Sequence, residues 1–158
     1  MDEQARKARE QRLDHKIDVL GVKLSDVVKI TYIEDDQEKS LKCMERPREQ
    51  FYDALREITK CYNGMETGEA KDVVFWVKTV SVKYKDGWIK KYKFTGDVHC
   101  RKWGRRPGFV DSDMEYTGKI ELDECVDMLL DEAVLYIRGL MAEPNLFEKE
   151  KSGGEAQK

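Results

Sequence analysis

The sequence has no long apolar run that could hold it in a membrane. No stretch approaches the ~18 consecutive apolar residues that a membrane-spanning helix requires. The first residues, Met1-Asp2-Glu3-Gln4, are not the apolar core of a secretion signal. We therefore expect a soluble protein of the cytoplasm. The 158 residues suit one domain, and an apolar content of 40% excludes wholesale disorder, although 39% of the residues are charged.

Cysteine and histidine are too few and too irregularly spaced to indicate a metal or nucleophile site. The four cysteines form no CxxC pair, and their spacing with His99 fits no known zinc-ligand pattern. There are two histidines, and no glycine-rich phosphate motif occurs. We therefore expect reduced thiols, no metal, no cofactor and no enzymatic activity. One weaker alternative is a Mg²⁺-dependent phosphodiesterase, because Asp111, Asp113 and Glu115 alternate and would share one face of a strand.

Apolar periodicity predicts the order α-ββα-ββα. The expected helices cover residues 1–20, 47–62 and 122–140, and the expected strands cover residues 27–33, 41–44, 73–84 and 88–98. This order favours an α+β fold in which a four-stranded antiparallel sheet carries the two long helices on one face. The predicted organisation is a charged N-terminal helix over 1–22, a single domain over 23–142 and a disordered tail over 143–158. Residues 99–119 are expected to be irregular.

The N-terminal helix carries only a narrow apolar stripe. Leu13, Ile17 and Leu20 recur at i, i+4 and i+7, and Gly21 follows as the expected end of the helix. Such a stripe is too narrow to stabilise an isolated helix in water. We therefore expect the helix to dock on the domain or to pair with a second copy as a homodimer.

The register of the longest predicted hairpin decides which face its lysines occupy. A two-residue loop at Asp86-Gly87 would bring Lys91 and Lys93 to the face of Val80 and Val82, whereas a three-residue loop keeps that face apolar. We therefore predict a three-residue loop over 85–87, with Lys83, Lys91 and Lys93 pointing away from the helices.

Positive charge is concentrated in one segment of an acidic chain. The whole chain has a net charge of −3, but residues 78–108 contain ten basic and two acidic residues, a net charge of +8. The rest of the chain therefore carries −11. Around Trp103, a basic loop follows the hairpin, and an aromatic ring among cations suits single-stranded nucleic acid. The predicted nucleic-acid-binding residues are Lys83, Lys91, Lys93, Arg101, Lys102, Trp103, Arg105 and Arg106. The alternative is a solvated surface, since lysines on exposed strands also confer solubility and protect edges.

Three phrases of the sequence resemble a group of small proteins from tailed phages and prophages of Gram-positive bacteria. They are Lys29-Ile30-Thr31-Tyr32, the run from Arg46 to Leu55, and Glu124-Cys125 together with Leu135-Tyr136-Ile137-Arg138-Gly139. The resemblance covers residues 27–62 and 120–140. It implies an accessory protein made alongside phage DNA metabolism, in the cytoplasm of the host cell, and it carries no catalytic residues.

The resemblance also raises a second function. Small phage proteins without active sites often bind a host protein, so the alternative is an effector that inhibits a host defence nuclease, as anti-CRISPR proteins do. Such an inhibitor could present an acidic surface to a nucleic-acid channel. The candidate residues for that surface are Glu34, Asp35, Asp36, Glu66, Glu69 and Asp72.

Overall fold

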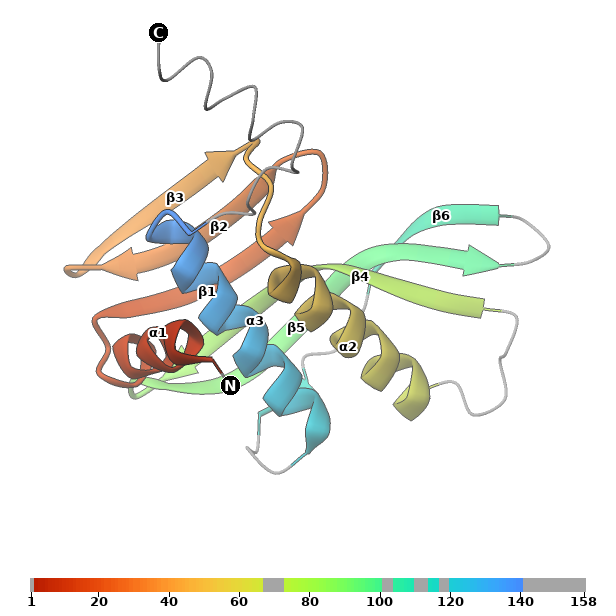
Figure 1. The fold of residues 1–158 in the computed structure, drawn as a ribbon. Helices are drawn as coiled ribbons and strands as arrows, with labels where there is room; N and C mark the ends of the chain where they lie inside the picture. The colour runs from red at the N-terminus through yellow and green to blue at the C-terminus, as the bar shows by residue number, and fades with distance from the viewer. Residues whose placement is uncertain (1, 67–72, 101–103, 110–113, 117–119, 141–158) are drawn as a thin grey trace, which may run out of the picture.

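A computed structural model shows an α+β fold in which three helices cover one face of an antiparallel sheet (Figure 1). It describes residues 2–66, 73–100, 104–109, 114–116 and 120–140, and at 63–66, 73–75, 98–100, 104–109 and 114 it describes the backbone alone. The helices are α1 (Glu3–Leu13), α2 (Glu49–Glu66) and α3 (Glu121–Ile137). No helix in these ranges is long and apolar enough to cross a membrane. The predicted tail, 143–158, lies outside the described residues.

The sheet has more strands than the four expected. Its strands are β1 (Ile17–Leu24), β2 (Val28–Glu34), β3 (Gln37–Cys43), β4 (Val73–Lys85), β5 (Trp88–Cys100), β6 (Gly104–Phe109) and β7 (Met114–Glu115). The main path runs β3-β2-β1-β4-β5-β6, and the short β7 pairs with β5. Residues 99–119 are therefore not all irregular. The backbone of 104–109 forms a ladder with 95–100, which makes β6 an edge strand.

The strand β1 replaces the second half of the predicted N-terminal helix. Helix α1 ends at Leu13, and the turn that follows contains His15 in the left-handed region, with a φ of 56°. Ile17, Val19 and Val22 are then buried as strand residues. Of the predicted stripe, only Ile17 is buried. Leu20 lies at the bulge between Val19 and Gly21, and Leu13 is 56% exposed at the end of α1. A dimer seam along one helical stripe of residues 13–20 is therefore wrong.

The β4–β5 hairpin has the predicted faces but not the predicted loop. Lys85 pairs in register with Trp88, so the loop is the two residues Asp86-Gly87. Both have positive φ, 54° and 83°, as a type I′ turn requires. A bulge at Lys90 then shifts the register, so that Lys83 lies opposite Lys91. Because of this bulge, Lys91 and Lys93 still point away from the helices, which is the orientation that the three-residue loop was expected to produce.

Helices α2 and α3 bury apolar faces against this sheet. Phe51, Ala54 and Ile58 of α2 are buried as predicted, and α2 continues through Asn63-Gly64 to Glu66 instead of ending there. Twelve of the 17 residues of α3 are buried, and Leu129 and Val134 are fully enclosed. Side chains of α2, α3 and the inner face of the sheet form one cluster, which fixes the opposite face of the sheet as the outer one.

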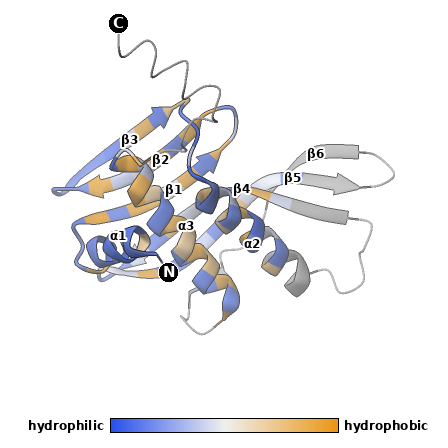
Figure 2. Cartoon of the chain, in the orientation of Figure 1, coloured by the Kyte–Doolittle hydropathy of each residue, from blue (hydrophilic) through white to orange (hydrophobic). Residues whose placement is uncertain are grey.

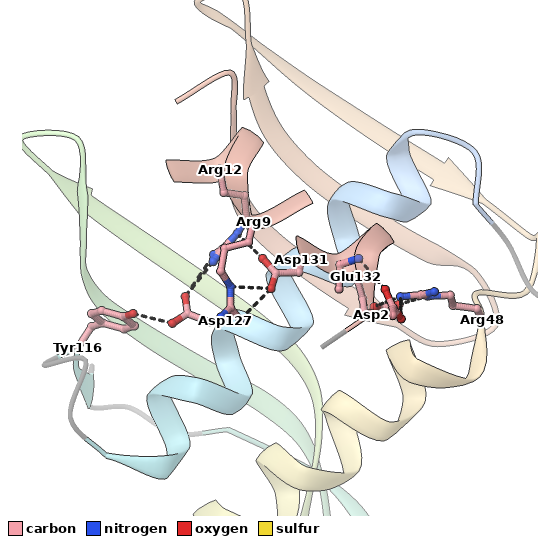
Figure 3. A network of polar contacts seen from close by, with 9 residues as sticks. Asp2, Arg9, Arg12, Arg48, Tyr116, Asp127, Asp131 and Glu132 are labelled. Carbon is pink, nitrogen blue, oxygen red and sulfur yellow. Dashed lines mark hydrogen bonds and ion pairs between the residues drawn. The ribbon is translucent and has the colours of Figure 1, made fainter. Parts of the chain in front are cut away.

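Helix α1 docks on α3 through charge rather than through an apolar stripe. Figure 2 shows α1 as almost wholly hydrophilic, and its buried residues are Ala5, Ala8 and Arg12. The Arg12 side chain is only 7% exposed and donates to Asp127 Oδ1 at 2.8 Å and to Asp131 Oδ1 at 3.2 Å. Two small side chains thus allow close approach, and a buried arginine holds the helix in place (Figure 3).

The same network continues at both ends of the α1–α3 contact. Arg9 Nε donates to Asp131 Oδ2 at 2.9 Å, and the Tyr116 hydroxyl donates to Asp127 Oδ2 at 2.6 Å. Arg48 Nη2 bridges Glu132 Oε2, at 2.6 Å, and the helix-capping Asp2, at 3.1 Å (Figure 3). Burial raises the pKa of Asp131 to about 6, although Arg12 and Arg9 act in the opposite direction.

Candidate nucleic-acid interface

The face of the sheet opposite the helices is open throughout the described ranges. Along β2, Val28 and Ile30 are buried and Lys29 between them is exposed. Along β1, Val22 is buried and the next residue, Lys23, is exposed. Because successive side chains of a strand point to opposite faces, these lysines lie on the outer face. Figure 1 shows the helices gathered on the other side.

Three lysines form a row across the first three strands of this face. Lys29 lies in register with Lys23 on one side and with Lys42 on the other. Neighbouring strands are about 4.8 Å apart, so the three backbone positions span about 10 Å. All three residues are exposed. The sheet therefore places two like-charged pairs directly opposite one another, an arrangement that destabilises a sheet.

A second lysine group lies on β4 and β5. Lys83 is in register with Lys91, and Lys93 is in register with Ser81. Tyr92 and Phe94 alternate with these lysines and are buried, so Lys91 and Lys93 face outward. These are the three strand lysines predicted from the hairpin. Together the two groups make up what we call the lysine face: Lys23, Lys29, Lys42, Lys83, Lys91 and Lys93.

Two rows of residues connect the groups across five strands. One row runs from Lys42 through Lys29 and Lys23 to Thr79 and Thr95. The adjacent row contains, in order, Ser40, Thr31, Gly21, Ser81 and Lys93. Hydroxyl groups therefore lie between and beside the lysines. Lysine ammonium groups and serine or threonine hydroxyls are the donors that proteins commonly offer to phosphate oxygens.

Most of the lysine face is not neutralised by the protein's own carboxylates. Lys78, just outside it, is held by Asp97 at 2.8 Å, and Lys39 is held by Glu34 at 3.3 Å. In the described part of the chain, no such ion pair involves the following members of the face: Lys23, Lys29, Lys42, Lys91 and Lys93. The register places four acidic residues of the described strands on this face: Asp18, Glu38, Asp97 and Glu115. Asp97 is the partner of Lys78, and Glu115 lies opposite Lys91. The balance on the face is therefore positive.

A cavity adjoins the lysine face at the edge of β4, and its lining includes two aromatic rings and the carboxylates of Asp26 and Asp97. Beyond Thr79, β4 has no β1 partner, and a cavity of about 590 Å³ opens between this edge and α2. Trp76, which is 44% exposed, lines it together with Tyr52 and Arg56. Leu24, which follows Lys23, lines it as well. An indole accessible from such a cavity can stack on a nucleobase.

The structure brings together only part of the predicted site. Arg101, Lys102 and Trp103 lie outside the described residues. Arg105 and Arg106 belong to β6, which pairs with β5, and only their backbone is described. Of the alternating carboxylates, Asp111 and Asp113 also lie outside, and Glu115 is exposed on β7 opposite Lys91.

Sequence reasoning missed Lys23, Lys29, Lys42 and Trp76. The first three lie outside the segment in which positive charge is concentrated, and β1 was assigned to a helix, so its two sheet neighbours were unknown. The available signal was the alternation of each lysine with a buried valine, isoleucine or leucine.

Comparison with known proteins finds no matching family model, curated protein or solved structure. The functional assignment therefore depends on the geometry and charge of the lysine face and the cavity beside it.

Proposed function

We propose that this protein is a non-enzymatic accessory protein, of the phage type that its sequence resembles, which binds nucleic acid on the lysine face. The observation that carries the proposal is the set of three opposed lysine pairs, Lys23 with Lys29, Lys29 with Lys42, and Lys83 with Lys91. Like charges in register are unfavourable in a sheet, and the proposal depends on the first two pairs, whose three lysines form no ion pair with the described carboxylates. A phosphate bound between two ammonium groups converts the repulsion into two attractive contacts.

The cavity beside β4 supplies a reason for preferring single strands. Only an unpaired base can leave its stack and lie against an indole, and such stacking contributes about 1–3 kcal/mol per base. The exposed Trp76 lines the cavity and lies next to the Thr79–Thr95 pair, in register with Asp97, which supports this role. Trp103, in the segment between β5 and β6, is the second candidate from the sequence. We therefore propose that phosphates follow the lysines and that bases stack on tryptophan.

A salt series on labelled oligonucleotides tests the proposal. If all six lysines contact phosphates, the logarithm of the binding constant falls with the logarithm of salt concentration with a slope of about −4 for single strands and about −5 for duplex. Fluorescence anisotropy between 50 and 200 mM salt would then show a loss of roughly 300-fold or more. No binding at about 50 mM salt would exclude nucleic acid as the partner.

Charge-reversal variants locate the surface. Lys29→Glu with Lys93→Glu removes one lysine from each group and should abolish binding at about 100 mM salt. The matched control is Lys7→Glu with Lys60→Glu, which changes the net charge equally on α1 and α2. Both control residues are exposed on the helices that cover the other face. If the control weakens binding as much as the test variant, the effect reflects net charge and the lysine face is not the site.

Tryptophan variants test the strand preference. Trp76→Ala should weaken single-strand binding about 5-fold or more and leave duplex binding nearly unchanged. Trp88→Ala is the control, because Trp88 is 63% exposed at the hairpin tip, where its ring contacts His15. Trp103→Ala and the pair Arg105→Glu with Arg106→Glu extend the same comparison to the basic loop. Equal losses on both substrates would argue against stacking at Trp76.

The structure gives the effector alternative less support. Of its acidic candidates, Glu34 is already engaged by Arg138 Nη2 at 2.6 Å and by Lys39. Asp35 and Asp36 form the exposed β2–β3 turn. Glu69 and Asp72 lie outside the described residues. A stoichiometric host protein that is captured from lysate and withstands nuclease treatment would favour the effector over the nucleic-acid proposal.

A further inference from the structure

Helices α2 and α3 each contribute a glutamate and a cysteine, four residues apart, to one point of contact. The pairs are Glu57 with Cys61 on α2 and Glu121 with Cys125 on α3. The spacing of four residues places both members of each pair on the same side of their helix. The end of α2 lies beside the start of α3 (Figure 1). Four potential ligands therefore meet where two helices that are distant in sequence cross.

Distances between the ligand atoms suit a small cation. The two sulfur atoms, Cys61 Sγ and Cys125 Sγ, are 3.7 Å apart. Two thiolates on a tetrahedral zinc ion, each about 2.3 Å from the metal, are about 3.8 Å apart. Ligand atoms of Glu57, Cys61 and Glu121 lie within 4.8 Å of one another. Adjustment of the flexible glutamate side chains by about 1 Å would bring their oxygens to bonding distance of the same ion.

The cluster offers sulfur and oxygen ligands together, because two carboxylates stand beside the two thiols. Burial raises the pKa of both thiols, that of Cys125 to about 12, and the carboxylates of Glu57 and Glu121 raise both further. Two carboxylates and two protonated thiols are thus collected at a partly buried position. The hydrogen bond with Cys125 and the charge of Lys60 act in the opposite direction on the pKa of Cys61. A divalent ion would compensate the two carboxylates and favour deprotonation of each thiol that it binds.

We propose that Glu57, Cys61, Glu121 and Cys125 bind a thiophilic divalent cation such as Zn²⁺ and that the ion joins α2 to α3. On binding, the metal forms bonds to both sulfurs and both thiol protons pass to solvent, so affinity rises with pH. No electron is transferred. The site lies on the helix side of the sheet, separate from the lysine face. The metal-binding proposal is therefore tested independently of nucleic-acid binding.

Cadmium titration of the reduced, metal-free protein tests the proposal, because cadmium–thiolate bonds absorb in the ultraviolet. We expect the band to saturate at one ion per chain, with zinc displacing cadmium and raising the melting temperature. Cys61→Ser should reduce the band by half or more. Cys43→Ser is the matched control, because Cys43 lies on β3 and its sulfur accepts a hydrogen bond from the Glu45 backbone. No saturable band at tenfold excess metal would overturn the proposal.

The glutamate variants keep the test independent of folding. Glu121 is exposed and Glu57 is half-exposed, so Glu57→Gln with Glu121→Gln leaves the core intact. The double variant should bind cadmium at least tenfold more weakly, with unchanged circular dichroism. Affinity equal to that of the wild type would overturn the mixed ligand set. The proposal would also be overturned if Cys43→Ser reduced the cadmium–thiolate band as much as Cys61→Ser does.

Discussion

Replacing Arg12 by methionine tests whether a buried charge network attaches α1 to the domain. The substitution keeps an unbranched side chain and removes the guanidinium that bridges Asp127 and Asp131. Breaking a buried pair at one partner costs about 3–5 kcal/mol, because the remaining charge is left without compensation. Asp131 is 1% exposed and keeps only Arg9, whereas Asp127 keeps Tyr116. We therefore expect a loss near the lower end, about 3 kcal/mol.

Urea unfolding at pH 7, followed by circular dichroism, measures this loss by linear extrapolation. The control is Arg56→Met, because Arg56 is 54% exposed and its partners Glu49 and Asp53 are exposed as well. Removal of such a surface arginine changes stability by about 1 kcal/mol or less. Adding Asp131→Leu to Arg12→Met removes the orphaned carboxylate and should recover most of the loss. If Arg12→Met costs no more than Arg56→Met, the network does not hold α1 in place.

Two further predictions concern Asp131 and Gly96. Because its pKa is raised from 3.8 to about 6 in the folded protein, the stability that Asp131 contributes is fully present below about pH 4 and is lost as pH rises through about 6. The unfolding free energy of the wild type should therefore fall relative to that of Asp131→Asn by up to about 3 kcal/mol across this window, and a constant difference would contradict the assignment. At Gly96, an added methyl group would lie 1.8 Å from the Trp76 carbonyl oxygen. Gly96→Ala should lower the unfolding free energy by about 2 kcal/mol or more, whereas Gly21→Ala, whose methyl meets nothing nearer than 3.8 Å, should not.

Apolar patterns that continue over many residues predicted the elements that bury one face. The apolar face of α2, from Phe51 to Ile58, and the broad face of α3 needed no knowledge of their partners. The outward orientation of Lys91 and Lys93 was also predictable, because a continuous apolar face on the hairpin requires both lysines on the other face. The length of the loop was not predictable, because a two-residue turn combined with a bulge at Lys90 gives the same orientation as a three-residue loop.

Short segments with two compatible periods were predicted less well. Residues 13–20 satisfy a helical repeat, but β1 buries Ile17, Val19 and Val22 in the core between the sheet and the helices, a gain that no local pattern reveals. The pairing of 104–109 with β5 is equally a tertiary effect, because its sequence, Gly-Arg-Arg-Pro-Gly-Phe, has low strand propensity. Missing β1 also concealed half of the lysine face.

The position of the lysines within the sheet favours binding over simple solubility. Edge protection explains a lysine on an outer strand such as β3, where Lys42 lies. Lys23 and Lys29 lie on β1 and β2, each of which has a strand on both sides, so neither can block edge-to-edge pairing. Solubility requires charge, but it does not require like charges opposite one another, and the hydroxyl residues Thr31 and Ser81 show that neutral polar side chains also occupy this face. An anionic ligand that spans the strands explains both why these lysines lie on inner strands and why they lie opposite one another. Neither solubility nor edge protection explains both.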